Sequence, residues 1–566
     1  MPYRAPLSDF RFLLDHVVGF DQVTAAPRFA DVSPETVDAI LEGAGRLATE
    51  VIAPLNRAGD LHPARLENGI VRTSPGFVAG YRAIADGGWI AIAAGAQHGG
   101  MALPMTLATA VNEMLSGACL ALQLNPLLTQ GQIEALEHHA SDALKALYLP
   151  RLISGEWSGT MNLTEPQAGS DVGALTTQAH DRGDGTFAIT GQKIFITWGD
   201  SDVTANVCHL VLARLPDGGP GTRGISLFLV PKFLPDAEGQ PGQRNALSVV
   251  SLEHKLGIHG SPTCVMQFDG ATGWLVGKRN MGMAAMFTMM NNARLGVGAQ
   301  GIGVGEAALQ QAVAYAEARV QGTTETGEAG IIGHADVRRM LAMTRADIFS
   351  ARAIALACAV ALDMARATGA PEWGARAALL TPIAKAFGTD VGIAAAETGI
   401  QIHGGMGFIE ETGAAQFLRD VRITSIYEGT NGIQAMDLVG RKLADGGEAV
   451  MRLIQDVQDQ AEQARVALPE LAGDVWAAAE ALREATEWLL AHPLPDRFAG
   501  GAAYLRACAL TLGAAAHLRA ASCDIQRVPL ARIAIRRRLP EVSGLLAEMR
   551  AGAQGLFDIT TAELAA

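Results

Sequence analysis

Residues 187–197 read FAITGQKIFIT, and this segment decides the fold because it interrupts a chain that is otherwise helical in pattern. Short β-rich runs occur at 187–190, 193–197, 209–213, 225–230 and 265–268, and they are separated by Gly, Asp and Pro turns. Strand-forming residues at this spacing, with turn residues between them, predict a compact β domain in the middle of the chain.

Helical patterning begins upstream of this domain. Ser33, Pro34 and Glu35 form a helix start, because a hydroxyl caps free N–H groups, proline suits the first turn and an acid suits the positive end of the dipole. The pattern continues to about residue 158, with breaks expected at Gly59 and at Gly87.

Helical patterning also follows the β domain. Apolar residues at 337, 340, 341 and 348 recur at spacings of 3, 4 and 7, which predicts long helices over about 335–368 and 372–401. Beyond residue 441 lies a further helical block, with breaks expected at Pro469, Pro493 and Pro495.

The sequence therefore predicts a mainly α protein with a middle β domain and an added C-terminal helical domain. With 566 residues, of which 49% are hydrophobic and 18% charged, the chain is too apolar for a disordered scaffold. The expected parts are an N-terminal extension (1–39), a helical domain (40–158), the β domain (159–278), a catalytic helical bundle (279–444) and the C-terminal helical domain (445–566).

The net charge and the cysteines limit which partners and which compartment we expect. The formal net charge of -14 argues against nucleic acid, and the one basic stretch, ARIAIRRRLP at 531–540, is interpreted as a helix end or a subunit contact. Six cysteines stand singly, so we expect reduced thiols, no metal site and a cytoplasmic protein. Charges near the N-terminus argue against a secretory signal, and polar residues within 114–133 argue against an integral membrane segment.

Three further stretches carry chemistry, and each alone has an ordinary structural explanation. The turn in MNLTEPQAGSD (161–171) suits a pyrophosphate or flavin edge, or is a simple strand connection. The glycines of QIHGGMGF (401–408) admit a nucleotide close to the backbone, or end a helix. In FLRDVRITSIYEGTNGIQ (417–434), Glu428 follows an apolar approach, although a lone Glu is usually a surface residue.

Taken in order along the helical, β, helical plan, TEPQAGSD, KIFITWGD, QIHGGMGF and IYEGTNGIQ resemble the acyl-CoA dehydrogenase family over about residues 40–445. The resemblance implies FAD-dependent α,β-dehydrogenation of an acyl-CoA to a trans-2-enoyl-CoA, with electrons passed to electron-transfer flavoprotein. The N-terminal stretch 3–20, KLGIHGSPTC at 255–264 and the C-terminal block are similar to a bacterial branch that includes enzymes for 3-methylmercaptopropionyl-CoA. That branch favours a short acyl chain.

The resemblance also implies site residues. Glu428 would be the catalytic base, because burial beside an uncharged thioester would raise its pKa towards neutrality, and residues 290–293 offer no rival acid. Acyl-CoA contacts are expected at Ser170, Asn291, Arg294, Glu428 and Gly429. FAD contacts are expected at Met161, Leu163, Thr164, Ser170, Phe195, Ile196, Thr197, Arg319, Gln321, Gln401, Gly404, Gly405, Thr430 and Asn431.

Five of these residues, Arg319, Gln321, Gln401, Gly404 and Gly405, resemble residues that reach the FAD of a neighbouring subunit, which implies a homo-oligomer, most simply a dimer. Two alternatives remain open. An acyl-CoA oxidase would use oxygen in place of a protein acceptor, and a DNA-binding relative would use a basic C-terminal domain, which only 531–540 supports.

Overall fold

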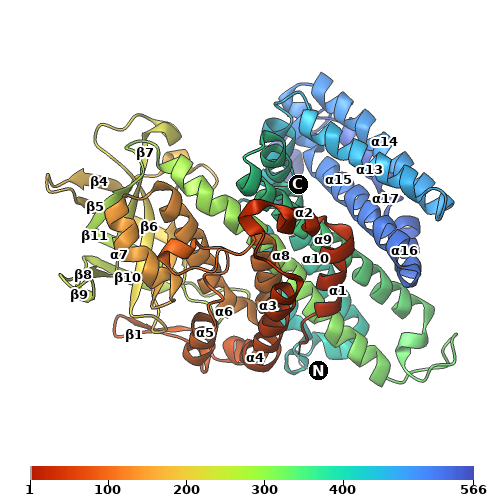
Figure 1. The fold of residues 1–566 in the computed structure, drawn as a ribbon, viewed down its shortest axis with the longest axis horizontal. Helices are drawn as coiled ribbons and strands as arrows, with labels where there is room; N and C mark the ends of the chain where they lie inside the picture. Colours follow the sequence, from red (N-terminus) through yellow and green to blue (C-terminus); the bar gives the residue numbers. More distant parts are fainter. Residues whose placement is uncertain (1–2) are drawn as a thin grey trace. The chain divides into compact units, whose positions relative to one another are not determined.

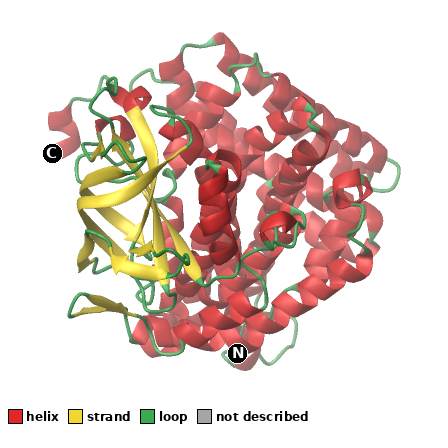
Figure 2. Ribbon diagram, turned by 60° about the vertical axis from the view of Figure 1, so that its left-hand side comes forward, coloured by secondary structure: helices red, strands yellow, loops and turns green. Residues whose placement is uncertain are grey.

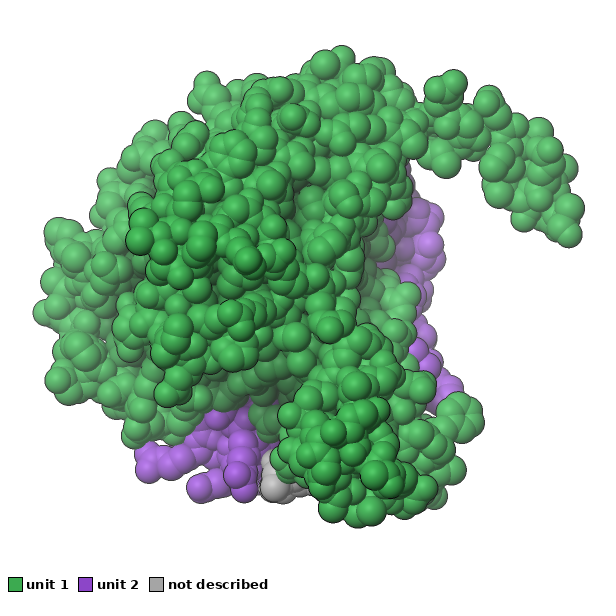
Figure 3. Space-filling model, turned by 90° about the vertical axis from the view of Figure 1, so that its right-hand side faces the viewer, with its two compact units in different colours: residues 1, 6–42, 294–566 green, residues 2–5, 43–293 purple. Residues whose placement is uncertain are grey.

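The computed structural model describes residues 3–566, and the chain divides into two compact units, coloured separately in Figure 3. Unit 1 contains residues 6–42 and 294–566, and unit 2 contains residues 3–5 and 43–293. The expected N-terminal extension thus belongs with the C-terminal half of the chain. The finer division into five parts stays a prediction.

Unit 2 contains a seven-stranded sheet, shown in yellow in Figure 2. The strand order is β10-β11-β5-β4-β6-β3, and β7 pairs with both β11 and β6. The strands are β3 (Trp157–Asn162), β4 (Gln178–Asp181), β5 (Phe187–Thr197), β6 (Asn206–Arg214), β7 (Ile225–Pro231), β10 (Leu247–Leu252) and β11 (Thr263–Val276), with small two-stranded sheets β1 (Arg65–Glu67) with β2 (Ile70–Arg72) and β8 (Phe233–Pro235) with β9 (Pro241–Arg244).

Every predicted β run lies within one of these strands. Strand β3 escaped prediction because its sequence, WSGTMN, has few strand-forming residues: only Trp157 is aromatic and only Thr160 is β-branched. It pairs in parallel with β6 over six residues, from Trp157 opposite Asn206 to Asn162 opposite Val211.

The helices of the first half start and end largely as local signals predict. They are α1 (Leu7–Phe12), α2 (Phe20–Ala25), α3 (Pro34–Arg46), α4 (Ala53–Leu61), α5 (Phe77–Asp86), α6 (Met105–His139) and α7 (Asp142–Ile153). The Thr36 amide donates to Ser33 Oγ at 3.3 Å, which confirms the capped start of α3. The break expected at Gly59 is wrong: Gly59 lies inside α4, where an added Cβ would stand 2.8 Å from the Phe77 ring.

The predicted bundle of unit 1 is built on three long helices. Its helices are α8 (Gly282–Ala318), which begins in unit 2, α9 (Ala335–Thr368), α10 (Pro371–His403), α11 (Ala414–Val421) and α12 (Asn431–Asp437). Helices α8 and α10 meet backbone to backbone: a Cβ at Gly301 would stand 2.4 Å from the Gly388 carbonyl oxygen. Some of the chain's 64 glycines therefore serve close helix packing.

The C-terminal block, drawn in blue in Figure 1, is an integral part of unit 1. Its helices are α13 (Glu448–Ala464), α14 (Pro469–Ala491), α15 (Leu494–Cys523), α16 (Val528–Ile533), α17 (Glu541–Arg550) and α18 (Thr561–Ala565). On α15, His517 Nε2 lies 3.0 Å from the Ala346 carbonyl oxygen of α9, and a Cβ at Gly513 would stand 2.6 Å from Ser350. The block is packed onto the bundle rather than tethered to it.

The basic stretch 531–540 makes its ion pairs within unit 1. Arg536 pairs with Glu470 at 2.9 Å and with Asp474 at 3.1 Å, and Arg538 pairs with Asp347 at 2.5 Å. Two of its four arginines are therefore neutralised by neighbouring acids, which favours the interpretation as a helix end over a phosphate-binding surface.

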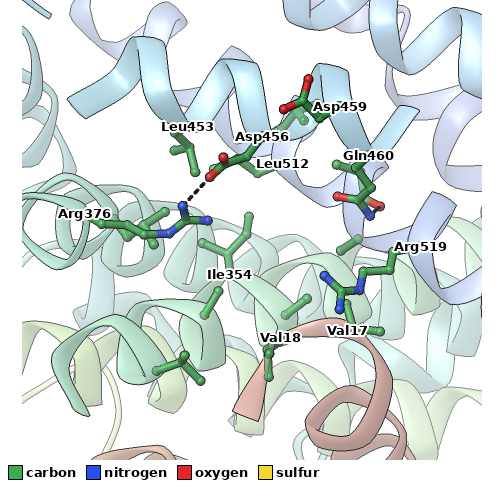
Figure 4. Close-up of a pocket in the computed structure, with 18 of the residues that line it drawn as sticks. Val17, Val18, Ile354, Arg376, Leu453, Asp456, Asp459, Gln460, Leu512 and Arg519 are labelled. Carbon is green, nitrogen blue, oxygen red and sulfur yellow. Dashed lines mark hydrogen bonds and ion pairs between the residues drawn. The ribbon is translucent and has the colours of Figure 1, made fainter. Parts of the chain in front are cut away.

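A crevice of about 810 Å³ opens among α9, α10, α13, α15 and the N-terminal segment of unit 1 (Figure 4). Arg376 pairs with Asp456 across it, and Val17, Val18 and Ile354 give it an apolar wall. None of the predicted site residues lines this crevice.

Within residues 3–566, three helices, α6, α9 and α15, are long and apolar enough to cross a membrane by length and composition. Contrary to expectation, polar residues within 114–133 do not remove α6 from this class. The most apolar windows of the three helices are 100%, 83% and 72% buried inside the structure, so protein packing accounts for their apolar residues.

Candidate active site

Glu428 lies in a short turn between a 3-10 helix (Arg422–Ser425) and α12. Glu428 and the following Gly429 both have left-handed backbone, with φ of 56° and 81°. This conformation costs a residue other than glycine about 1–2 kcal/mol. Strain of this kind persists where surrounding contacts enforce it, and it is concentrated at functional sites.

Two side chains enforce the turn. Lys385 Nζ, on α10, donates to the Gly429 carbonyl oxygen at 2.9 Å and to Asn431 Oδ1 at 2.9 Å. Gln434 Nε2, on α12, donates to the carbonyl oxygens of Glu428 at 3.1 Å and Gly429 at 3.3 Å. Hydrogen bonds from a charged donor contribute about 1.5–3 kcal/mol, enough to offset the backbone strain.

The electrostatic setting of Glu428 shifts the pKa of its carboxyl group. Burial raises the pKa of Glu428 from 4.5 to about 7, although the positive charges of Arg294 and Lys385 favour its carboxylate form. Burial likewise lowers the pKa of Lys385 to about 8. Arg294, on α8, also faces Asp437, whose Oδ2 lies 3.9 Å from Arg294 NH1. A carboxyl group that titrates near neutrality is matched to proton abstraction at physiological pH.

Backbone donors accompany the carboxyl group. Within residues 3–566, the N–H groups of Glu428 and Gly429 have no hydrogen-bond acceptor. Thr430 caps α12 by accepting from the Ile433 amide at 3.3 Å. An N–H with no acceptor, beside a base, is the arrangement that stabilises a developing oxyanion.

In unit 2, a β-bulge in β5 contains the exposed residue Phe195. The register between β5 and β11 shifts between the pairs Ile196–Cys264 and Lys193–Met266, so two residues of β5 oppose one of β11. Phe195 sits in this bulge with φ of 60°, and its residue surface is 58% exposed. Bulges re-aim side chains next to active sites. The ring is thus available to cover a planar ligand.

A buried ion pair fixes the adjoining loop. Lys193 Nζ, fully buried, donates to Glu165 Oε1 at 2.8 Å and to the Leu163 carbonyl oxygen at 3.0 Å. Glu165 also accepts from the amides of Thr176 and Thr177. These two charged residues hold the backbone of 163–165 in place. Sequence reasoning missed both, because Lys and Glu in a β region normally indicate a solvated face.

The remaining predicted residues fall into two sets. In unit 2, Met161, Leu163, Thr164 and Thr197 are half-buried and Ser170 is exposed, while Asn291 lies on the part of α8 that belongs to unit 2. In unit 1, Arg319, Gln321, Gln401, Gly404 and Gly405 are all exposed. The structure brings Arg294, Glu428, Gly429, Thr430 and Asn431 together within unit 1.

The side chains present largely fit FAD. Exposed Phe195 suits an isoalloxazine face, and the hydroxyls of Thr164, Ser170 and Thr197 suit its polar edges. An added Cβ at Gly404 or Gly405 would meet nothing, so their backbone is open to a ligand.

Two predicted cofactor residues need correction. The Ile196 side chain belongs to the apolar core of the sheet, so only its backbone is available to a cofactor. The Asn431 amide nitrogen donates to Ala386 O, Thr389 Oγ1 and Asp390 Oδ1, and its oxygen accepts from Lys385. That side chain is therefore fully used inside unit 1.

Comparison with known families matches three consecutive segments of the chain. The acyl-CoA dehydrogenase N-terminal domain matches residues 34–156, the middle domain 160–271 and the C-terminal domain 280–443. The chain belongs to the acyl-CoA dehydrogenase family. This acyl-CoA dehydrogenase carries about 120 residues beyond the last match, which form the C-terminal block described above.

Two relatives match most of the chain. 3-Methylmercaptopropionyl-CoA dehydrogenase of Ruegeria pomeroyi is 48% identical over 80% of this chain and 79% of its own. Butyryl-CoA dehydrogenase of Syntrophomonas wolfei is 34% identical over 80% of this chain and 77% of its own.

Solved structures show the same fold. Caenorhabditis elegans ACDH-11 in complex with C11-CoA has a TM-score of 0.81 at 20% identity, covering 99% of this chain and 96% of its own. An acyl-CoA dehydrogenase of Bacillus anthracis complexed with FAD has a TM-score of 0.77 at 21% identity, covering 98% and 93%. A chain from a structure of the electron transferring flavoprotein of Acidaminococcus fermentans has a TM-score of 0.62 at 26% identity, covering 73% and 99%.

Proposed function

We propose that this acyl-CoA dehydrogenase converts an acyl-CoA thioester to its trans-2-enoyl-CoA, with Glu428 as the base. FAD, when bound, supplies the acceptor for the β-hydride. Glu428 takes the α-proton, and the electron pair of the broken Cα–H bond becomes the new π bond. The observation that supports this most is the Glu428 turn, which combines a carboxyl group of raised pKa with backbone donors that have no acceptor within residues 3–566.

The chain's own residues account for the proton transfer. A thioester α-proton is weakly acidic, so a carboxylate of pKa 4.5 would be a poor base, and a pKa near 7 improves the driving force. A backbone N–H of the turn would donate to the thioester oxygen as negative charge develops there, and one such donor typically contributes about 3–4 kcal/mol.

The test is anaerobic mixing of the yellow holoenzyme with a panel of acyl-CoAs while flavin absorbance is followed. We expect bleaching by at least one short acyl-CoA and none from Glu428→Gln, which should retain FAD. Bleaching by Glu428→Gln would move the base elsewhere. Oxygen consumption with hydrogen peroxide formation at the rate of turnover would instead identify an acyl-CoA oxidase.

The substrate we propose is a short acyl-CoA, with 3-methylmercaptopropionyl-CoA as the first candidate. The relative at 48% identity carries that name, and the butyryl-CoA enzyme supports a short chain. Electron-transfer flavoprotein is the proposed acceptor, and the likeness to a chain from a structure of such a protein supports it. Comparing kcat/KM for 3-methylmercaptopropionyl-CoA and for straight chains of graded length tests the substrate.

We further propose a cytoplasmic homodimer without an integral membrane segment. Exposure of Arg319, Gln321, Gln401, Gly404 and Gly405 supports contact with a cofactor held by a second copy. All six cysteines are free and five are buried, which supports a reducing compartment. Light scattering after size exclusion tests the dimer, and cell fractionation tests the compartment and the absence of membrane insertion.

A further inference from the structure

Lys385 is an unusual residue for the interior of a bundle. Its side chain is fully buried on α10, and both acceptors of its hydrogen bonds, the Gly429 carbonyl and the Asn431 amide oxygen, are neutral. A buried ammonium is costly to desolvate unless charges and hydrogen bonds compensate. A neutral donor would satisfy the same two acceptors at a lower desolvation cost. These two hydrogen bonds alone therefore do not explain why a charged residue is buried here.

The contacts of Asn431 orient its side-chain amide, so that the amide oxygen is the atom that accepts from Lys385. The Asn431 amide nitrogen donates to α10, to Asp390 Oδ1 at 2.7 Å, Thr389 Oγ1 at 3.0 Å and Ala386 O at 3.3 Å. Its oxygen therefore faces Lys385, and the ammonium joins α10 to Gly429 and to Asn431, both on the C-terminal side of Glu428. The arrangement couples the backbone of the base to a rigid helix.

We propose that Lys385 is a positioning residue for the reaction: it holds Glu428 in its left-handed conformation through Gly429 and Asn431, and its charge keeps the carboxyl group able to ionise. The inference rests on the proposed function, in which Glu428 is the base. Lys385 itself is not assigned any contact with substrate or cofactor.

Few charged side chains act on Lys385 and Glu428. Arg294 on α8 and Lys385 on α10 favour the carboxylate form of Glu428, and Asp390 on α10 favours the charged form of Lys385. Tyr427, beside the base, donates its hydroxyl to Gln300 Oε1 on α8. Loss of Lys385 would leave Arg294, already facing Asp437, as the only positive charge acting on Glu428 within residues 3–566.

The test compares Lys385→Met, Lys385→Arg and Lys232→Met, all as FAD-loaded holoenzymes. Lys232 is a matched control, since its side chain is only 12% exposed and it pairs with Asp200 at 2.6 Å in unit 2. We expect Lys385→Met to retain FAD, to slow bleaching by the best substrate at least tenfold at pH 7, and to move the midpoint of the pH–rate profile up by about one unit. Lys385→Arg should restore the midpoint, and Lys232→Met should match the wild type.

Hydrogen–deuterium exchange gives a readout that does not depend on activity. Amides in a peptide spanning 424–434 should exchange faster in Lys385→Met than in the wild type or Lys232→Met. Lys385→Arg, which keeps a charged donor at this position, should exchange as slowly as the wild type, so the idea can be tested even if Lys385→Met fails to fold.

The outcomes separate the two proposals. Wild-type rate, pH midpoint and exchange in Lys385→Met would overturn the positioning role while leaving Glu428 as the base. Bleaching by Glu428→Gln would instead overturn the proposed base.

Discussion

Asp9 Oδ2 lies 3.3 Å from the NH1 nitrogen of Arg352, a residue 343 positions later in the chain. The same carboxylate pairs with Arg345 at 2.6 Å and with Arg527 at 3.0 Å, and Glu306 pairs with Arg352 at 2.9 Å. Two acids and three arginines thus join the N-terminal segment, the bundle and the C-terminal block within unit 1.

Replacing Asp9 by Asn should lower the free energy of unfolding by about 3–5 kcal/mol. The substitution leaves buried Arg352 paired with Glu306 alone, and it removes the carboxylate that pairs with Arg527. Denaturant unfolding measures the change. As a control, Asp38→Asn removes a surface pair with Arg11 at 2.8 Å and should cost less than about 1 kcal/mol. Equal effects of the two substitutions would contradict the role of the cluster.

The acid cluster predicts a loss of stability at low pH. Burial raises the pKa of Asp9, but Arg352, Arg345 and Arg527 outweigh it and hold that pKa below 3.8; arginines likewise hold the pKa of Glu306 below 4.5. Folded pKa values below the unfolded ones stabilise the protein above about pH 4.5, and this stabilisation disappears as pH falls through the folded values. Unfolding followed from pH 6 to 3 should show a steeper decline for the wild type than for Asp9→Asn. Parallel curves would contradict the assignment.

The raised pKa of Glu428 predicts the opposite dependence of stability on pH. Its folded pKa, near 7, lies above the unfolded value of 4.5, so above pH 7 the ionised carboxyl costs the native state about 1–3 kcal/mol. Glu428→Gln should therefore be more stable than the wild type at pH 8, with the difference vanishing below about pH 5. The wild-type bleaching rate should rise with pH, with a midpoint near 7. Melting temperatures at pH 5 and 8 provide the check, and a destabilised Glu428→Gln at pH 8 would refute it.

Glycines on the facing helices predict a contrast between two alanine substitutions. Gly301→Ala should destabilise by about 1–3 kcal/mol and slow the reaction, because its Cβ would press on the Gly388 carbonyl and part α8 from α10, the helices of Arg294 and Lys385. Gly374→Ala, on the exposed start of α10, meets nothing within 4 Å and should stabilise by about 0.5–1 kcal/mol. Thermal melts and bleaching rates distinguish the two.

Much of the architecture could be read from local patterns. Strand-forming residues between turn residues predicted the strands at 187–197 and 225–230, and the capped start at Ser33 predicted α3, because both signals depend on near neighbours. Glu428 emerged from its motif, but its left-handed backbone left no mark except the glycine that follows it. Lys385 looked like any helix lysine, because only the fold reveals that it is buried against residues 44 and 46 positions away.

Unit 1 is discontinuous in sequence, and this imposes an order on its assembly. All of unit 2 except residues 3–5 is one continuous stretch, so it can begin to fold as soon as about residue 293 has been synthesised. Asp9, by contrast, must wait for Arg527, 518 positions later, which at about 5–20 residues per second takes roughly half a minute to two minutes. The ion-pair cluster of the N-terminal segment therefore stays incomplete until residue 527 has been synthesised, and a chain interrupted between residues 352 and 527 can pair Asp9 with Arg345 and Arg352 but not with Arg527.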